Sequence, residues 1–308
     1  MSIYLVTGAA GFIGAALAKV LISQGNKVVS IDNLSTGSLD NVPNGVEFFL
    51  GDCGDPSIYE AIPEYQYDAI FHIAGQSSGE ISFDDPIYDI KTNTESTLLL
   101  LKFAIERKCS RFIYASTMSV YGELIDQVAD ENLICQPKSF YGVGKLASEN
   151  YLKIYEEYGI NTTSLRLFNV YGPGQNLANH RQGMVSIFLA QLINQKSIHV
   201  KGSGDRFRDF IYIDDVVDAF ISCLKNDKSF GEVINVGTGI KTSIDELIDN
   251  LLEISKTKSP IKFNGNTSGD IHGIYANVKK FKRLLNSNKL TPIDEGLKKM
   301  WQWATNIN

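Results

Sequence analysis

A glycine-rich turn near the start of the chain constrains its fold more than any other feature. Residues 7–14 carry the sequence Thr-Gly-Ala-Ala-Gly-Phe-Ile-Gly and follow a short apolar run at 3–6 that is typical of a buried strand. Apolar residues at three- and four-residue spacing then predict a helix from Phe12 onward. Glycine lets the backbone turn sharply and approach a ligand closely. The helix start would face a phosphate, so the segment predicts a phosphate-binding turn, although its G-x-x-G-x-x-G spacing differs from the common G-x-G-x-x-G.

A carboxylate ends the next predicted strand. Residues 27–31 form a second apolar run, and Asp32 follows it directly. A carboxylate at this position can accept hydrogen bonds from an adenosine ribose and would repel a 2′-phosphate. Asn33 comes next, rather than an arginine that could hold such a phosphate. These features favour NAD over NADP as the cofactor, and a solvated loop aspartate is the alternative.

Strand and helix patterns alternate through the first half of the chain. Further strands are predicted at 46–50, 68–73, 111–115 and 162–167, and helices at about 86–108 and 139–158. This alternation predicts an α/β fold, a Rossmann-like doubly wound parallel sheet with helices on both faces. Ligands bind such sheets at the carboxyl ends of the strands. We therefore expect one shared site at that edge, formed by Gly8, Asp32, Asp52, Ala74 and Thr117.

The pattern loosens after residue 167, which indicates a second lobe. We expect an NAD-binding Rossmann domain at 1–168 together with about 212–236, which returns to the sheet. Residues 169–211 and 237–308 then form a smaller α/β C-terminal substrate lobe, with helices near 184–194, 243–254 and 293–303. The segment 98–105 is apolar on nearly every helical face, so we expect it to be buried on all sides, in a large core or against a partner subunit.

Composition excludes several other classes of protein. The 308 residues have a net charge of −6 and a pI near 5.3, which argues against nucleic acid or an acidic membrane surface as a partner. The four cysteines show no C-x-x-C spacing, so we expect reduced thiols in a cytoplasmic protein and no metal site. No apolar run reaches the roughly 18 residues of a membrane helix, and the first strand leaves no room for a signal peptide.

A tyrosine and a lysine carry the predicted chemistry. Tyr141 and Lys145 are four residues apart on a predicted helix, so they share one face. Taking a proton from a hydroxyl needs a base whose pKa is near the working pH, and a free tyrosine has a pKa of about 10. A nearby ammonium lowers that pKa, and Lys145 can also bind a nicotinamide ribose. Thr117 supplies a hydroxyl at the end of a strand that can bind the same substrate oxygen.

Several motifs together resemble a known family. They are 7–14, Asp32, Ala-Ser-Thr-Met-Ser-Val-Tyr-Gly at 115–122, Tyr-Gly-Val-Gly-Lys at 141–145 and Arg-Leu-Phe-Asn-Val-Tyr-Gly-Pro at 166–173. Over essentially its whole length, the chain resembles the extended short-chain dehydrogenase/reductase family. Within that family it is most similar to the NAD-dependent nucleotide-sugar epimerases of the UDP-glucose 4-epimerase type. The resemblance implies Tyr141, Lys145 and Thr117 as the catalytic group.

The resemblance also implies two sets of binding residues. Those expected to hold NAD are Gly8, Gly11, Phe12, Ile13, Gly14, Asp32, Asn33, Asp52, Cys53, Ile73, Ala74, Gly75, Asn93, Tyr141, Lys145 and Phe168. Those expected to bind a nucleotide-diphosphate sugar, with a UDP-sugar favoured, are Ser77, Thr117, Asn169, Arg208, Asp270 and Ile274. The resemblance further implies a homodimer, in which the helices near 98–105 and 139–158 pair with their copies; burial of both helices within one chain is the alternative.

Two departures from the family pattern refine the expected reaction. Thr267 stands where relatives carry an arginine that clamps the diphosphate, so the match does not name the nucleotide. Met118 and Ser119 follow Thr117 where the related 4,6-dehydratases and decarboxylases carry acidic residues. Neither side chain exchanges a proton near neutral pH, so elimination at C5–C6 of the sugar lacks its acid and base. Oxidation and reduction at the same carbon remain, and we therefore expect 4-epimerisation. A 4-ketoreductase and a non-catalytic NAD-binding sensor are the alternatives.

One residue is expected to select the sugar. The resemblance places Ile274 beside the C2 substituent, where its stiff branched side chain would disfavour an N-acetyl group. A plain C2 hydroxyl is therefore expected.

Overall fold

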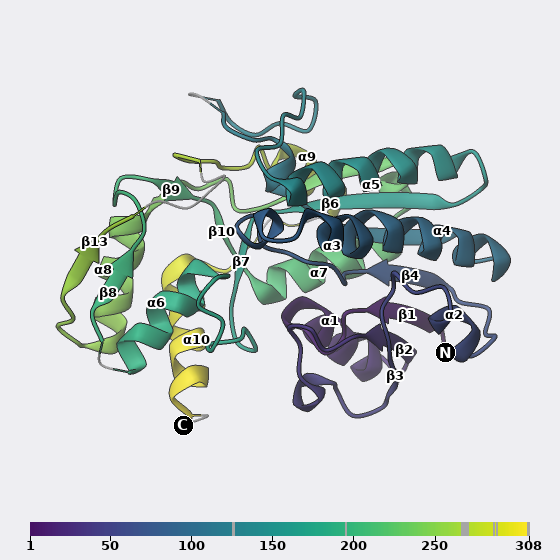
Figure 1. Ribbon diagram of the computed structural model, residues 1–308, viewed down its shortest axis with the longest axis horizontal. Coiled ribbons are helices and arrows are strands. Elements are labelled where there is room, and N and C mark those ends of the chain that lie inside the picture. The colour runs from purple at the N-terminus through teal and green to yellow at the C-terminus, as the bar shows by residue number, and fades with distance from the viewer. Residues whose placement is uncertain (125–126, 195, 266–270, 286, 288, 307–308) are drawn as a thin grey trace.

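The computed structural model describes residues 1–124, 127–194, 196–265, 271–285, 287 and 289–306. Its principal elements alternate as the sequence predicts through the first half of the chain (Figure 1). The strands are β1 Ile3–Thr7, β2 Lys27–Asp32, β3 Val46–Leu50, β4 Ala69–His72, β5 Arg111–Thr117, β6 Asn161–Leu167, β7 Asn169–Tyr171, β8 Ile198–Val200, β9 Phe207–Arg208, β10 Phe210–Tyr212, β11 Glu232–Val236, β12 Thr242–Ser243 and β13 Ile261–Phe263. The α-helices are α1 Phe12–Ser23, α2 Ile58–Ala61, α3 Pro86–Ile90, α4 Ser96–Glu106, α5 Phe140–Glu156, α6 Met184–Ile193, α7 Ile213–Leu224, α8 Ile244–Ser255, α9 Lys279–Leu285 and α10 Ile293–Asn306.

A seven-stranded parallel sheet forms the centre of the molecule, in the order β11-β6-β5-β4-β1-β2-β3. The predicted doubly wound fold is thereby confirmed. The chain runs outward from β1 to β3 and then returns to β4 on the other side of β1. This reversal opens a crevice at the carboxyl ends of β1 and β4, where ligands bind in such sheets. The expected return of the chain to the sheet near residue 236 occurs as β11, which pairs with β6.

Helices cover both faces of the sheet because alternate strand residues are apolar on both sides. On one face, Leu17 of α1 and Phe220 of α7 belong to the same buried cluster as Val6 and Phe71. On the other face, Leu101 of α4 and Leu152 of α5 pack with strand residues that include Leu5, Ile70 and Phe112. Most strand residues are therefore buried on both faces, although β6 also buries polar side chains, among them Thr163 and Arg166.

The helical run predicted at 86–108 is one continuous segment with an irregular middle. Helices α3 and α4 are joined by a π-helical turn at Lys91–Glu95. Leu100, Leu101 and Phe103 are buried, but Ile105 keeps 42% of its surface exposed. The rest of this chain therefore does not bury the helix on all sides, and burial of its remaining exposed side by a partner subunit stays a prediction.

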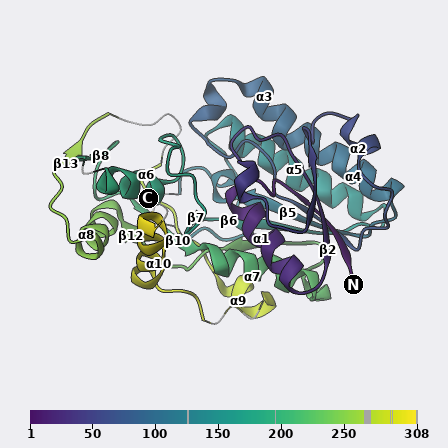
Figure 2. The same ribbon diagram turned by 90° about the horizontal axis from the view of Figure 1, so that it is seen from below.

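A smaller lobe lies beside the sheet and consists of α6, α8 and α10 with the short strands β8, β9, β12 and β13 (Figure 2). Asp209, between β9 and β10, ties this lobe to the segments after β11. Its buried carboxylate accepts hydrogen bonds from the N–H groups of Thr238, Gly239 and Ala276 at 2.8–3.1 Å. No helix in the described part of the chain is both long and apolar enough to span a membrane.

Candidate active site

A cleft of about 700 Å³ opens at the carboxyl ends of the strands and extends over the smaller lobe. This volume suits a dinucleotide cofactor together with part of a substrate. The structure brings nineteen of the residues expected from the sequence to its walls: Gly8, Gly11, Phe12, Ile13, Gly14, Asp32, Asn33, Asp52, Cys53, Ile73, Ala74, Gly75, Ser77, Thr117, Tyr141, Lys145, Phe168, Asn169 and Arg208.

The glycine-rich turn leaves the backbone open to the cleft. Gly8 has φ +80°, and a Cβ at this position would lie 3.0 Å from the backbone nitrogen of Ala74. A Cβ on Gly14 would lie 2.1 Å from the carbonyl oxygen of Gly8, so α1 can approach β1 only because Gly14 has no side chain. Gly11 caps α1 without a side-chain hydrogen bond. The first N–H groups of α1 can therefore be satisfied by a phosphate, as the sequence predicts.

The Asp32 carboxylate has a fixed position in the cleft. Its Oδ2 accepts a hydrogen bond from the N–H of Ala10 at 3.0 Å, and its Oδ1 accepts one from the N–H of Leu34 at 2.8 Å. Each carboxylate oxygen has a further lone pair, so Asp32 can still accept hydrogen bonds from a ribose. Beside it, the amide of Asn33 donates to Asp52 at 2.8 Å, which orders the same end of the cleft.

Helix α5 carries the tyrosine and lysine to the end of β5. Ser139 caps this helix by accepting a hydrogen bond from the N–H of Gly142 at 3.1 Å, which fixes where the helix starts. Tyr141 is 8% exposed and Lys145 3% exposed. The ammonium of Lys145 donates to the carbonyl of Ala115 at 3.0 Å and lies 5.9 Å from the centre of the Tyr141 ring.

Burial has the largest effect on the pKa values of both Tyr141 and Lys145. It raises the pKa of Tyr141 to about 12, although a hydrogen bond with Thr117 opposes the change. Burial also lowers the pKa of Lys145 to about 8. The expected lowering of the Tyr141 pKa by Lys145 is therefore not found in the protein alone, because desolvation of the phenolate outweighs it and the ammonium is directed at the Ala115 carbonyl.

Comparisons with known proteins agree with this arrangement. The family model described as "NAD dependent epimerase/dehydratase family" matches residues 4–237. The chain belongs to this family. It is 33% identical over 306 residues to a putative UDP-glucose 4-epimerase of Methanocaldococcus jannaschii, covering 99% of both chains. The family resemblance seen in the sequence is thus confirmed, and with it NAD as the cofactor.

Solved structures of family members are similar over the whole chain. UDP-glucose 4-epimerase of Thermotoga maritima, solved with UDP-glucose, has a TM-score of 0.95 at 34% identity and covers 100% of this chain and 99% of its own. UDP-glucose 4-epimerase of Thermus thermophilus, solved with NAD, has a TM-score of 0.91 at 29% identity and covers 100% of both chains. The glycine turn and Asp32 form a cradle that fits this cofactor.

Two of the expected binding residues that the structure describes, Asn93 and Ile274, do not line the cleft. Asn93 is fully buried behind it, where its amide donates to the carbonyl of Gln76 at 2.9 Å and so orders the loop after β4. Ile274 is 1% exposed and belongs to an apolar cluster with Val120 and Phe168. Ile274 therefore lies behind residues that line the cleft, and its selection of the C2 substituent stays a prediction. Asp270, like Thr267, lies outside the described residues.

Arg208 lies at the cleft, but backbone groups engage its guanidinium. Its Nη1 donates to the carbonyl of residue 207 at 2.7 Å, and its Nη2 donates to that of residue 271 at 3.0 Å. Only 4% of the residue is exposed. Arg208 thus joins β9 to the chain beyond residue 270, in addition to any contact with a ligand.

A buried ion pair supports the catalytic strand. Glu149 of α5 accepts hydrogen bonds from Arg166 of β6 at 2.7 and 2.9 Å and from the hydroxyl of Ser116 at 2.5 Å. Because Ser116 precedes Thr117, this pair fixes the carboxyl end of β5 against the helix that carries Tyr141 and Lys145. Sequence reasoning missed it, and the only signal was an arginine within a predicted buried strand, Arg166 of β6.

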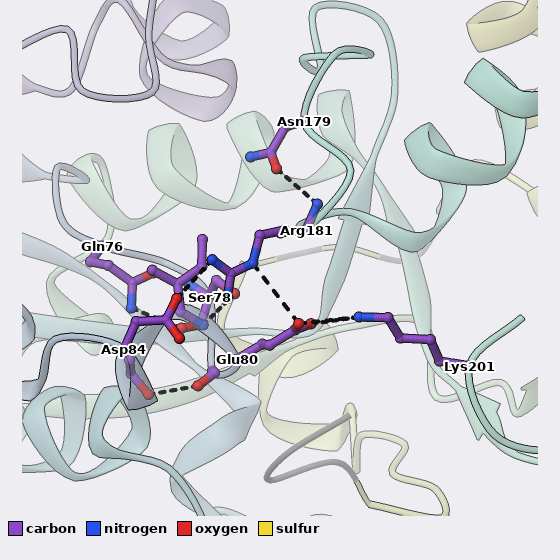
Figure 3. A network of polar contacts seen from close by, with 10 residues as sticks. Gln76, Ser78, Glu80, Asp84, Asn179, Arg181 and Lys201 are labelled. Carbon is purple, nitrogen blue, oxygen red and sulfur yellow. Dashed lines mark hydrogen bonds and ion pairs between the residues drawn. The ribbon is translucent and has the colours of Figure 1, made fainter. Parts of the chain in front are cut away.

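Sequence reasoning also missed a polar network across the cleft. The loop after β4 and two loops of the smaller lobe meet there, with Glu80 between Arg181 and Lys201 (Figure 3). Arg181 pairs with Asp84 at 2.7 Å, and Gln182 donates to the hydroxyl of Ser77 at 2.5 Å. These loops carry no motif, so no local pattern could have placed them together. Within the described ranges, no cluster of three His, Cys, Asp or Glu side chains could hold a metal ion.

Proposed function

We propose that this family member is an NAD-dependent nucleotide-sugar 4-epimerase. The observation that carries the proposal is the set Thr117, Tyr141 and Lys145 at one point of the NAD cleft, followed by Met118 and Ser119, which also line the cleft. A hydroxyl, a phenol and an ammonium suit the removal and return of a hydroxyl proton. No carboxylate stands at the two positions after Thr117, where elimination of water would need one.

Three side chains of the protein would have separate roles in the reaction. Tyr141, as the phenolate, takes the proton of the C4 hydroxyl and becomes a phenol, and Thr117 hydrogen-bonds the same oxygen. Lys145 would orient the nicotinamide ribose, and its positive charge favours the phenolate form of Tyr141 that accepts the proton. NAD, when bound, accepts the C4 hydride and returns it to the other face of the 4-keto sugar. Since the cofactor is restored at each turnover, the enzyme needs no second redox substrate.

The substrate and the binding roles belong to the same proposal. A UDP-sugar is favoured because the similar proteins are named UDP-glucose 4-epimerases and one is solved with UDP-glucose. Asn169 and Arg208 would contact its diphosphate. The cofactor lobe would comprise 1–168 with about 212–236, and the substrate lobe would comprise 169–211 and 237–308. A cytoplasmic location is part of this proposal, supported by four cysteines that form no disulfide in the described chain.

A homodimer is likewise proposed. The helices expected to pair with their copies, α4 and α5, leave large apolar side chains exposed in the single chain, among them Ile105 at 42%, Val143 at 54% and Ile154 at 52%, and Ile87 of the neighbouring α3 is 63% exposed. Phe83 and Phe140 extend this surface, with their ring centres 5.5 Å apart. Exposed apolar side chains gathered on neighbouring helices are typical of a protein interface. A second copy of the chain, pairing through the same helices, would cover them.

The test is an assay of the purified protein with UDP-glucose and UDP-galactose. We expect interconversion of the two sugars without net consumption of NADH. Tyr141→Phe should retain NAD and lose about 10²–10⁴-fold in turnover, because the proton acceptor is gone. Net oxidation of NADH would identify a ketoreductase instead. Binding of NAD with no change in any nucleotide sugar would identify a sensor, and near-normal turnover in Tyr141→Phe would exclude the mechanism.

A further inference from the structure

Four cationic side chains of the smaller lobe's loops and strands line the described cleft: Arg181, Lys201, Arg206 and Arg208. Under the proposed function, on which this inference rests, the cleft binds a nucleotide diphosphate with at least two negative charges. Charge-assisted hydrogen bonds to such a group are strong. The present partners of each cation therefore indicate which cation can exchange its partner for a phosphate.

Two of the three arginines hold backbone carbonyls, and the third pairs with a carboxylate outside the cleft. Arg208 donates to the backbone carbonyls of residues 207 and 271 at 2.7 and 3.0 Å. Arg206 donates to the carbonyl of residue 203 at 3.1 Å and to that of residue 201. Arg181 lies 2.7 Å from the carboxylate of Asp84, which does not line the cleft, and 3.9 Å from that of Glu80. The contacts of Arg206 and Arg208 join backbone segments that border the cleft, and the partner of Arg181 lies outside it.

Lys201 differs because its partner is a carboxylate inside the cleft. Its ammonium lies 3.1 and 3.3 Å from the two carboxylate oxygens of Glu80 (Figure 3). The Lys201 side chain is 51% exposed and that of Glu80 26% exposed. An ion pair this accessible to water contributes little to stability. The ammonium has three N–H donors on a flexible stem and can therefore follow a new anion.

We propose that Lys201 binds the diphosphate of the substrate and that Glu80 holds its ammonium until the substrate displaces it. Glu80 comes from the loop after β4, and Lys201 follows β8 in the other lobe, so the pair spans the cleft. A diphosphate offers more charge and more acceptor oxygens than one carboxylate. Glu80 thus keeps the cation in place and, at the same time, competes with the substrate for it.

This proposal makes opposite predictions for the two partners of one ion pair. Removing the charge of Lys201 removes a ligand of the diphosphate, whereas removing the charge of Glu80 removes its competitor. If the pair only tied the lobes together, either change would break the same contact and would affect binding in the same direction. Binding of UDP therefore separates a ligand-binding pair from a structural one, and it does so without a sugar or a reaction.

The experiment is calorimetric titration of the NAD-loaded protein with UDP and with uridine. We expect Lys201→Gln to weaken UDP binding about 10-fold, the loss of one charged hydrogen bond. Glu80→Gln should tighten UDP binding about 3-fold, because an exposed ion pair no longer competes. Uridine, which has no phosphate, should bind all variants equally. Rising salt should reduce the difference between the wild type and Lys201→Gln, since it screens exposed charges.

A matched control uses an ion pair on α10 whose residues do not line the cleft. Lys299 and Glu295 lie 2.7 Å apart and are 45% and 55% exposed. Lys299→Gln and Glu295→Gln should leave UDP binding unchanged. The inference is overturned if both cleft variants weaken UDP binding, if neither changes it, if uridine binding changes equally, or if the wild type binds no UDP. Epimerase activity is measured separately, so UDP binding as described without sugar interconversion would reject the proposed function and retain Lys201 as a diphosphate ligand.

Discussion

At the scale of single residues, Asp32 has the most specific chemical role. Both of its carboxylate oxygens accept backbone N–H groups, from Ala10 and Leu34 at 3.0 and 2.8 Å. Its charge therefore stays at one point beside the glycine-rich turn. A 2′-phosphate at that point would meet a fixed negative charge, which explains why a family member with this residue prefers NAD.

Changing Asp32 should relax the choice of cofactor. Asp32→Ala removes the repulsion, so we expect NADP to bind at least about 10-fold more tightly than to the wild type, while NAD binding weakens through the loss of hydrogen bonds to the ribose. Fluorescence titration with NADH and NADPH measures both. Asp68→Ala, a carboxylate at the opposite end of the sheet, is the control. A wild type that binds both cofactors equally would show that Asp32 does not discriminate between them.

At the scale of elements, the contact between α5 and β6 positions the catalytic group. The Glu149–Arg166 pair is almost fully enclosed, with side-chain exposures of 2% and 5%. Its hydrogen bond to Ser116 reaches the end of β5. The two partners come from separate elements, so the pair aligns the helix that carries Tyr141 with the strand that carries Thr117.

Breaking this pair should be costly. Glu149→Ala leaves a buried guanidinium without its carboxylate, and we expect the free energy of unfolding to fall by about 3–5 kcal/mol. Glu106→Ala removes the partner of Lys102, which lies 3.9 Å away on the exposed side of α4. This change should alter the free energy of unfolding by less than about 0.5 kcal/mol. Urea unfolding followed by circular dichroism gives both values. Equal effects of the two substitutions would show that the buried pair has no special role.

At the scale of the whole molecule, the exposed apolar side chains of α3 and α5 bear on the proposed dimer. Ile87 and Ile154 are 63% and 52% exposed in the single chain. If a second copy covers this surface, charges placed on it must be desolvated in the dimer and not in the monomer. The proposed dimer is therefore open to a direct test.

The double variant Ile87→Asp/Ile154→Asp should be a monomer at micromolar concentration, whereas the wild type should be a dimer. Light scattering coupled to size-exclusion chromatography measures the mass of each. Ile240→Asp, on an equally exposed isoleucine at 63%, should leave the wild-type mass unchanged. A wild type that elutes as a monomer would instead mean that these helices stay exposed to solvent.

The sequence by itself determined the cofactor half of the protein. Strand and helix periodicity, the glycine turn and the four-residue spacing of Tyr141 and Lys145 are local properties, because each depends on neighbours along the chain. Parallel pairing then brings the strand ends to one edge whatever the loops do. For this reason the cofactor cradle and Thr117 could be predicted from the sequence and are found together along one cleft.

Only the tertiary structure decided which other side chains reach the cleft. Glu80 and Lys201 are 121 positions apart, and their contact depends on how three loops fold against one another. Packing also buried Asn93 and Ile274 behind the residues that line the cleft. The position of a residue in a sequence motif does not specify the direction in which its side chain points. Burial likewise raised the pKa of Tyr141, because desolvation depends on all surrounding atoms and not on one neighbour in sequence.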